Sequence, residues 1–177
     1  MKLQRFVKKN TQVSSKTCLK TKKVNGSSPT GKSEPEKPEE PKPKAKKLSQ
    51  IEIEMLKTHA VSAMAFARPR RSGLAVGCSL LDTKNNYFTG ANVELLWQRC
   101  SHAEENTIIG SITHDGGEVR AICIAADREL FTPCGHCMDL ILEFSQKTAS
   151  IIHYNPRTRK TTIIPLKKMM PYYPTRK

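Results

Sequence analysis

The sequence predicts an α/β layer structure, and three observations lead to this fold class. Helical and extended patterns alternate between residues 73 and 144. The run 119–126 is almost continuously apolar, as expected of a strand that is covered on both faces. Only six residues, 155–160, separate the last two extended segments. Alternating strands and helices favour parallel pairing, whereas so short a connection allows only an antiparallel hairpin.

The domain is expected to start with a helix over residues 49–67. Ser49 and Glu52 have the spacing of a capping box and stand directly before an apolar-periodic segment. Residues 73–81 then form an apolar run, and residues 87–94 alternate between apolar and polar side chains. Turn-forming residues lie between these two runs, so they predict two strands of a hairpin at one edge of the sheet.

The rest of the domain reads as helix, strand, helix and two strands. Residues 102–112 suit a short helix, and the apolar run 119–126 follows as a strand. Residues 134–144 have apolar side chains at helical spacing. The last two strands are expected at 150–154 and 161–165, paired antiparallel.

Residues 1–48 are predicted to be a disordered arm with a Pro/Glu/Lys linker. The chain carries a net charge of +14, and residues 1–50 contribute +10 of it, with 14 Lys and Arg against 4 Asp and Glu. With few apolar side chains to bury, such a segment cannot offset the entropy cost of folding. The folded domain is therefore expected over residues 49–177.

The basic arm is compatible with several roles. A charge run is most often a solvated tail, but the arm could also be a nuclear address, an organellar import signal or a binding site for RNA. The sequence has no signal-peptide core and no long apolar run, so no membrane partner is expected. A reducing compartment is then the default for its six cysteines. We expect a cytoplasmic protein, with nuclear and organellar locations left open by the arm.

Two short motifs carry side chains that bind metals. Glu104 follows His102 by two residues, and Cys134 and Cys137 have the Cys-x-x-Cys spacing. Two thiolates and one imidazole suit a catalytic zinc site whose fourth position is kept for water. We therefore predict that Zn²⁺ is the cofactor and that Glu104 moves protons to and from that water. The pattern H-x-E with P-C-x-x-C is typical of zinc-dependent nucleobase deaminases.

The spacing also constrains where the metal lies. His102 and Glu104 are two residues apart, so they cannot share one side face of a helix. Both can serve one site only if the metal lies beyond the N-terminal end of that helix. Cys134 and Cys137 begin the next helix, so two helix N-termini should converge on the zinc and favour the thiolate form of both cysteines.

A closed structural zinc site is the competing interpretation. Cys100 lies two residues before His102 and could supply a fourth ligand, which would leave no position for water. His136 lies between the two cysteines of the second motif. We expect His136 in a loop or beside the ligands rather than on the metal, because its neighbours already complete the set.

From about Ile51 to the C-terminus the chain resembles the cytidine deaminase family. The matching segments are Val76–Leu81, Phe88–Glu94, His102–Glu104, Thr132–Cys137 and Met169–Pro171. The resemblance implies a three-layer α/β/α fold with a mixed five-stranded sheet, zinc on His102, Cys134 and Cys137, and Glu104 as the proton shuttle. It also implies that the protein converts cytidine and deoxycytidine to uridine and deoxyuridine in pyrimidine salvage.

The same resemblance implies further contacts and partners. Asn92 and Glu94 would hydrogen-bond the ribose hydroxyls of a nucleoside, and the backbone of Ala103 would read the base. The protein would be a homo-oligomer, a dimer or a tetramer with sites shared between subunits. Relatives commonly have Pro-Tyr-Ser and an aromatic residue before Val-Gly, and this chain departs from that pattern in having Arg70, Arg71, Ser72 and Leu74 at those places.

The sequence leaves a second substrate class open. The protein could deaminate cytosine or adenine within RNA or DNA, or a modified nucleoside. The basic arm would suit a polynucleotide, as would Arg68, Arg70 and Arg71 near the expected mouth of the site. Trp97 would suit single-stranded nucleic acid. The short connection 155–160 favours free nucleosides, because enzymes resembling the polynucleotide branch place a helix between the last two strands.

Overall fold

The computed structural model describes residues 47–97, 99–129 and 132–169. The predicted arm, except for Lys47 and Leu48, lies outside this range, as do Met170 and Pro171 of the last matching segment.

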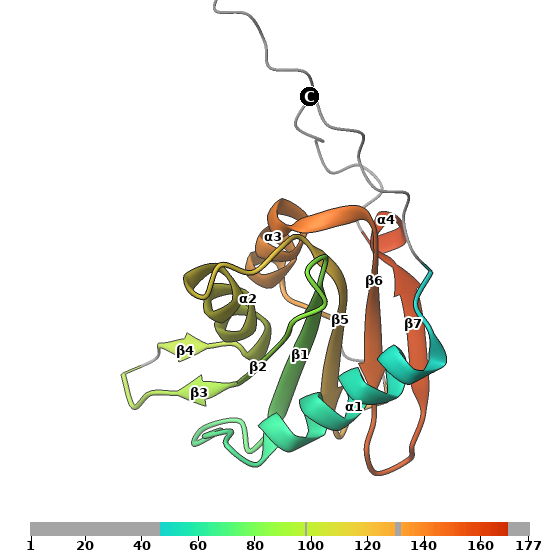
Figure 1. Ribbon diagram of the computed structural model, residues 1–177. Helices are drawn as coiled ribbons and strands as arrows, with labels where there is room; N and C mark the ends of the chain where they lie inside the picture. The colour runs from blue at the N-terminus through green and yellow to red at the C-terminus, as the bar shows by residue number, and fades with distance from the viewer. Residues whose placement is uncertain (1–46, 98, 130–131, 170–177) are drawn as a thin grey trace, which may run out of the picture. The chain divides into compact units, whose positions relative to one another are not determined.

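A mixed five-stranded sheet with the strand order β2-β1-β5-β6-β7 forms the centre of the domain (Figure 1). Its strands are β1 (Val76–Asp82), β2 (Tyr87–Ala91), β5 (Val119–Ala126), β6 (Ser145–Tyr154) and β7 (Thr161–Pro165). Strands β5 and β6 are parallel, and the other neighbouring strands are antiparallel. The expected mixed sheet, with hairpins at both edges, is confirmed.

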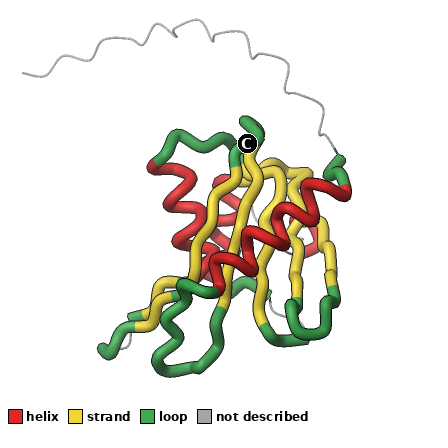
Figure 2. The backbone as a smooth tube through the Cα atoms, turned by 60° about the horizontal axis from the view of Figure 1, so that its bottom comes forward, coloured by secondary structure: helices red, strands yellow, loops and turns green. Residues whose placement is uncertain are grey.

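Helices cover both faces of this sheet and make three layers. Helix α1 (Gln50–Met64) lies on one face, and α2 (Ala103–Thr113) and α3 (Gly135–Phe144) lie on the other, as Figures 1 and 2 show from two directions. A short helix that the sequence did not predict, α4 (Leu166–Met169), follows β7. None of the helices in the described ranges is long and apolar enough to span a membrane.

The core is divided by the sheet into two clusters. Side chains of a strand alternate between its faces, so neighbouring residues of β5 serve different layers. Ile122 and Ile124 pack in the cluster under α2 and α3, whereas Ala121 and Cys123 pack in the cluster under α1. Burying one large aliphatic side chain contributes about 1.5–3 kcal/mol, so β5, buried along its whole length, anchors all three layers.

The predicted capping box starts α1 and also ties it to the sheet. The backbone N–H of Glu52 donates to Ser49 Oγ at 3.2 Å, and the Ser49 N–H donates to Glu52 Oε2 at 2.7 Å. The other carboxylate oxygen of Glu52 accepts a hydrogen bond from Arg120 Nη2 of β5 at 3.1 Å. Both side chains of this ion pair are largely buried. The first turn of the domain is therefore fixed to its central strand.

The predicted strand over residues 87–94 is wrong in one respect, because the chain leaves the main sheet at Asn92. Asn92 Oδ1 accepts from the Val76 N–H at 2.9 Å, and its Nδ2 donates to the Leu74 carbonyl at 3.0 Å. The Asn92 N–H still donates to the Val76 carbonyl at 3.1 Å, but its side chain takes the Val76 N–H and its carbonyl accepts from the Arg68 N–H at 2.9 Å, so the ladder with β1 ends here. Residues beyond the break form β3 (Val93–Glu94), which pairs antiparallel with β4 (Cys100–Ser101) in a separate small sheet.

Three boundaries also differ from the sequence prediction. Helix α1 ends at Met64 rather than near residue 67. Strand β1 begins at Val76, since Gly73 has a positive φ of 67° and belongs to a turn. Strand β6 begins at Ser145, because a register shift opposite β5 extends its pairing with Val119. The expected hairpin of β6 and β7 is confirmed, and its short connection leaves no room for a helix.

Replacing Gly77 by alanine should strongly destabilise the domain, because α1 crosses β1 at this residue. A Cβ on Gly77 would collide with the carbonyl oxygen of Ala60 and lie 2.7 Å from the backbone nitrogen of Met64. Backbone atoms cannot yield as a flexible side chain would, so we expect a loss of about 2–3 kcal/mol or more in the free energy of unfolding. Urea unfolding measures this loss.

Gly110 provides the matched control for this prediction. It lies inside α2, and nothing stands within 4 Å of the position that its Cβ would occupy. Gly110→Ala should therefore raise the free energy of unfolding by about 0.4–1 kcal/mol through helix propensity and reduced freedom of the unfolded chain. Equal stability of the Gly77 and Gly110 variants would contradict the close packing of α1 on β1.

Candidate active site

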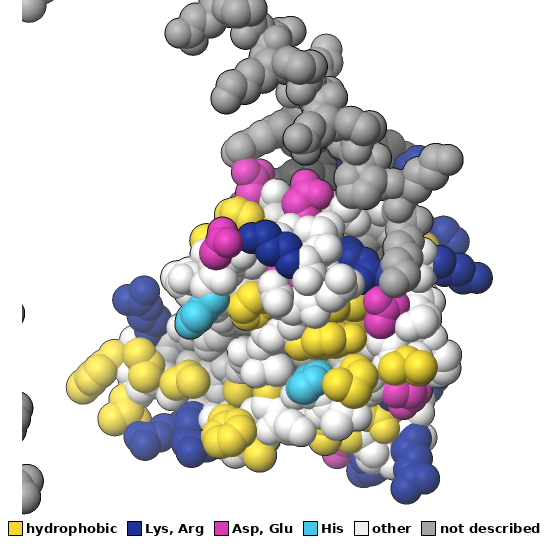
Figure 3. Space-filling view, in the orientation of Figure 1, with side chains coloured by type: hydrophobic (Ala, Val, Ile, Leu, Met, Phe, Trp, Pro, Cys, Tyr) yellow, Lys and Arg dark blue, Asp and Glu magenta, His cyan; other side chains and the backbone are white. Residues whose placement is uncertain are grey.

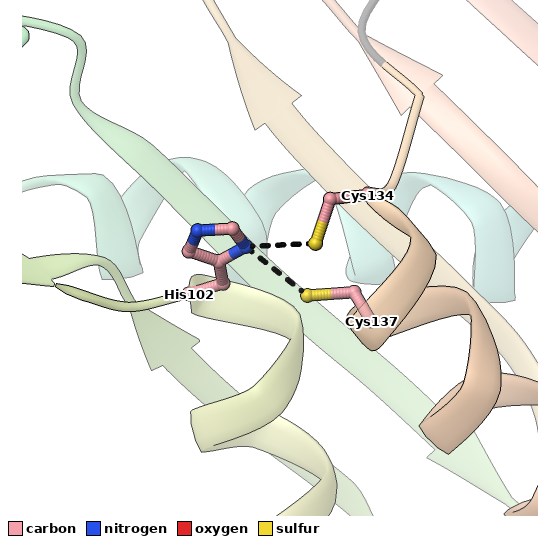
Figure 4. A group of neighbouring side chains, drawn as sticks. All are labelled: His102, Cys134 and Cys137. Atoms are coloured by element: carbon pink, nitrogen blue, oxygen red, sulfur yellow. Dashed lines mark hydrogen bonds between the residues drawn. The ribbon is translucent and has the colours of Figure 1, made fainter. Parts of the chain in front are cut away.

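Two helices begin side by side at the candidate site. His102 is the N-cap of α2 and Cys134 is the N-cap of α3, and both have extended backbone angles, with φ, ψ of −80°, 156° and −69°, 169°. Cys137 lies in the first turn of α3. Figure 4 shows the imidazole and the two thiols pointing toward one another from these two helix ends. The predicted convergence of two helix N-termini is confirmed.

The three ligand atoms are close enough to share one ion. Nδ1 of His102 lies 3.2 Å from the sulfur of Cys134 and 3.3 Å from the sulfur of Cys137. All three atoms lie within 4.8 Å of one another. In a tetrahedral site with Zn–N of about 2.0 Å and Zn–S of about 2.3 Å, a nitrogen and a sulfur ligand are about 3.5 Å apart. The donor types and their spacing therefore fit zinc.

Cys100 does not join this group. It lies in β4, where it pairs with Glu94 of β3, and it is exposed. Among the residues that the structure describes, the group of side chains that could hold a metal consists of His102, Cys134 and Cys137. The arrangement therefore favours an open site with three protein ligands over a closed site with four.

Glu104 lies in the first turn of α2 with its side chain in the interior. Only 2% of its surface is exposed. Burial raises the pKa of its carboxyl group above the usual range, and a hydrogen bond with the Cys137 thiol partly opposes this shift. A carboxyl group beside the metal-binding thiol, shielded from bulk water, can accept and return a proton at the site.

The environment of Cys137 differs from the sequence expectation. Helix N-termini favour the thiolate form, but burial and the neighbouring Glu104 raise the pKa of the Cys137 thiol well above its usual value. Without a metal ion, desolvation therefore favours the neutral thiol of Cys137. A metal ion reverses the balance, because a coordinating thiol is deprotonated by the charge of the ion.

The two polar residues predicted to contact ribose lie on either side of Val93: Asn92 stands between β2 and β3, and Glu94 is the last residue of β3. The carboxylate of Glu94 accepts hydrogen bonds from the Ser72 hydroxyl at 2.6 Å and from the N–H groups of Arg71 and Ser72 at 2.6 and 2.9 Å. The Ser72 hydroxyl and these two N–H groups lower the pKa of Glu94. Asn92 is buried and bonds to the backbone on either side of Ala75. Both side chains thus hold the segment between α1 and β1 in place.

Ala103 is fully buried as the first residue of α2. Its carbonyl accepts a hydrogen bond from the Thr107 hydroxyl at 2.7 Å. Its N–H is one of the first four of the helix, which have no helical acceptor. That N–H group is therefore suited to bind an acceptor atom next to the metal-binding group.

His136 and Glu105 form a contact that the sequence analysis missed. His136 lies in the first turn of α3, and its Nε2 is 3.4 Å from Glu105 Oε1. This position agrees with the prediction that His136 lies beside the metal ligands. Glu105 also caps the backbone of His102, from which it is three residues removed. This spacing from an N-cap residue is that of a capping box and could have drawn attention to Glu105.

Comparison with known proteins identifies the family. The model of the cytidine and deoxycytidylate deaminase zinc-binding region matches residues 50–153, which is more than half of the chain. This chain belongs to the cytidine and deoxycytidylate deaminase family. Zinc is accordingly its cofactor, in agreement with the group formed by His102, Cys134 and Cys137.

Individual deaminases of the family are distant relatives. A cytidine deaminase from Klebsiella pneumoniae is 32% identical over 94 residues, which are 51% of this chain but only 30% of that protein. One from Mycobacterium tuberculosis is 27% identical over 108 residues, covering 60% of this chain and 81% of that protein. The chain thus spans less than a third of the first relative and most of the second.

Solved structures of cytidine deaminases share the fold. The enzyme from Mycobacterium tuberculosis superposes with a TM-score of 0.59 at 24% identity, over 70% of this chain and 98% of that one. The enzyme from Burkholderia pseudomallei gives a TM-score of 0.63 at 23% identity, over 67% and 96%. Identities this low speak for the fold alone. They place the described domain in the deaminase fold.

Substitution of single cysteines should separate the open site from the closed one. Cys134→Ser should lose most of the bound zinc, because two ligands rarely retain the ion. Cys100→Ser should bind zinc as the unchanged protein does, since Cys100 lies outside the group. Elemental analysis of purified proteins gives the zinc content per chain. Loss of zinc from the Cys100 variant would revive the closed four-ligand site.

Proposed function

We propose that the protein catalyses the hydrolytic deamination of cytidine and deoxycytidine to uridine and deoxyuridine, a reaction of pyrimidine salvage. The observation that carries this proposal is the buried carboxyl group of Glu104 next to three potential zinc ligands at two helix N-termini. Membership of the family supports the cytosine ring as the reacting group.

The proposed roles follow from the positions of the side chains. His102, Cys134 and Cys137 would hold the zinc, which lowers the pKa of water enough for hydroxide to form near neutral pH. Glu104 accepts the proton of the attacking water on a carboxylate oxygen and passes it to N3 of the ring. Its carboxylate then takes the second proton, from the new hydroxyl group on C4, and delivers it to the amino group at C4, which leaves as ammonia. One water is consumed for each ammonia released.

The proposed contacts with the nucleoside use hydrogen-bonding positions that Glu94, Asn92 and Ala103 have left over. A carboxylate offers about four lone-pair positions, and Glu94 uses three for Arg71 and Ser72. One position is left for a ribose hydroxyl. The amide of Asn92 likewise has one N–H and one lone pair beyond its two backbone bonds. The free N–H of Ala103 would bind the base.

The β6–β7 hairpin supports a free nucleoside over a polynucleotide. The short connection between these strands carries three basic residues, Arg157, Arg159 and Lys160. Arg157 Nε lies 2.6 Å from Asp127, and Lys160 Nζ lies 3.4 Å from Glu129. Arg157 and Lys160 are thus paired with acids of the loop that follows β5, so their charge is less available for phosphate groups.

A deaminase acting on single-stranded nucleic acid is the second candidate, and one surface favours it. Leu95, Leu96 and Trp97 between β3 and β4 are 49, 72 and 91% exposed. Arg70, Arg71 and Arg99 are exposed nearby and have no ion pair among the described residues. Figure 3 shows hydrophobic and basic side chains together on the side where β3 and β4 project. Aromatic side chains next to arginines suit stacked bases and phosphates.

Glu104→Gln should retain zinc and lose nearly all turnover. The amide cannot accept the proton of water, and loss of a general acid–base group typically lowers the rate by about 10²–10⁴-fold. The rate of cytidine conversion and the zinc content of the variant are measured together. Glu118→Gln is the matched control, because Glu118 is exposed and lies in the connection before β5. A Glu104 variant with ordinary turnover would refute the proton shuttle.

Substrate choice decides between the two candidate functions. Purified protein should deaminate cytidine and deoxycytidine and leave cytosines in a single-stranded oligonucleotide unchanged, because two of the three basic side chains of the β6–β7 connection are already paired with acids. The release of ammonia and sequencing of the recovered oligonucleotide measure both reactions in parallel. Conversion of the oligonucleotide with no reaction on the nucleosides would overturn the main proposal.

A further inference from the structure

The metal-binding group is divided between two helices. His102 comes from the start of α2, whereas Cys134 and Cys137 come from the start of α3. The nitrogen–sulfur distances of 3.2 and 3.3 Å therefore depend on how the two helix ends lie relative to each other. A shift of about 1 Å between the helices would spoil a site whose bonds to zinc are fixed within about 0.2 Å.

One carboxylate connects these two helix ends. Oε2 of Glu105 accepts the backbone N–H of His102 at 3.2 Å, and Oε1 lies 3.4 Å from Nε2 of His136. His136 is the residue immediately before Cys137. One oxygen of Glu105 thus binds the backbone of His102, and the other contacts the residue next to Cys137. Among ion pairs of described residues, this is the one that links α2 to α3.

Glu105 and Glu104 are neighbours in α2 but differ in direction, burial and partners. Successive residues of a helix point about 100° apart, so the two carboxylates face different surroundings. Glu104 is buried against Cys137, whereas the side chain of Glu105 is 24% exposed and that of its partner His136 is 63% exposed. A pair this exposed adds little to global stability. Its effect should therefore be local.

We infer that Glu105 is a positioning residue that holds the N-termini of α2 and α3 at the separation required by the zinc. It acts through the His102 backbone and the His136 ring and touches neither metal nor substrate. The inference rests on the proposed use of His102, Cys134 and Cys137 as zinc ligands. Groups that orient metal ligands in this way typically change metal affinity by 10–100-fold when they are removed.

Zinc affinity tests this role without reference to activity. The full chain is stripped of metal, and the dissociation constant for Zn²⁺ is measured by competition with a chromophoric chelator. Glu105→Ala should bind zinc about 10–100-fold more weakly than the unchanged protein. Its denaturant midpoint without metal should fall only slightly, because the variant loses one N-terminal hydrogen bond of α2 and a contact whose His136 side is largely exposed. Glu118→Ala serves as the control and should match the unchanged protein in both measurements.

Two further variants distinguish positioning from a general loss of structure. Glu105→Gln keeps an oxygen that can accept the His102 N–H, so it should recover part of the affinity lost in Glu105→Ala. His136→Ala should also weaken zinc binding, and the double variant should bind zinc no more weakly than Glu105→Ala alone, because both changes break one connection.

The outcomes that overturn the inference are distinct from those that overturn the proposed function. Zinc affinity of Glu105→Ala within twofold of the unchanged protein would refute the inference, as would losses in the two single variants that simply multiply in the double variant. A denaturant midpoint of the metal-free Glu105→Ala variant that falls further than the loss of one helix cap explains would assign the residue a structural role instead. Failure of the unchanged protein to bind zinc would remove the proposed function itself.

Discussion

The direction of three strands determines where the chemistry of this domain lies. Strands β2 and β5 both run antiparallel to β1, and β6 is parallel to β5, so all three point the same way. Helices α2 and α3 return the chain between these strands on one face of the sheet. Both helices must therefore begin at the same edge, beyond the carboxyl ends of the strands, where ligands bind in open α/β sheets. The metal-binding group follows from this topology.

The sequence predicted those parts of the fold that depend on residues close together in the chain. The capping box of Ser49, the buried run of β5 and the short β6–β7 connection each fix one element without help from distant residues. The two-residue spacing of His102 and Glu104 similarly predicted a metal beyond a helix end. The resemblance to deaminases then implied which residues bind zinc, which one moves protons and which reaction they catalyse, all of which spacing alone leaves open.

The features that the sequence did not reveal depend on distant partners. The alternating pattern of residues 87–94 continues through Asn92, but bonds to Leu74 and Val76 end the strand there. Likewise, the pKa of Cys137 depends on Glu104, which lies on another helix. Glu105 looked like an ordinary helix residue until α3 placed His136 beside it. Patterns in sequence do not encode which side chains two packed helices bring together.

The separation of the ligands along the chain has a consequence for how the protein acquires its metal. His102 and Cys134 are 32 residues apart, with α2 and β5 between them. The unfolded chain brings such distant ligands together only at the entropy cost of closing a long loop. With His102, Cys134 and Cys137 as its ligands, zinc would bind tightly only after β5 has joined the sheet, and it would then act as a cross-link that stabilises the folded state. Metal loading would thus come late in folding and would report that the central strand is in place.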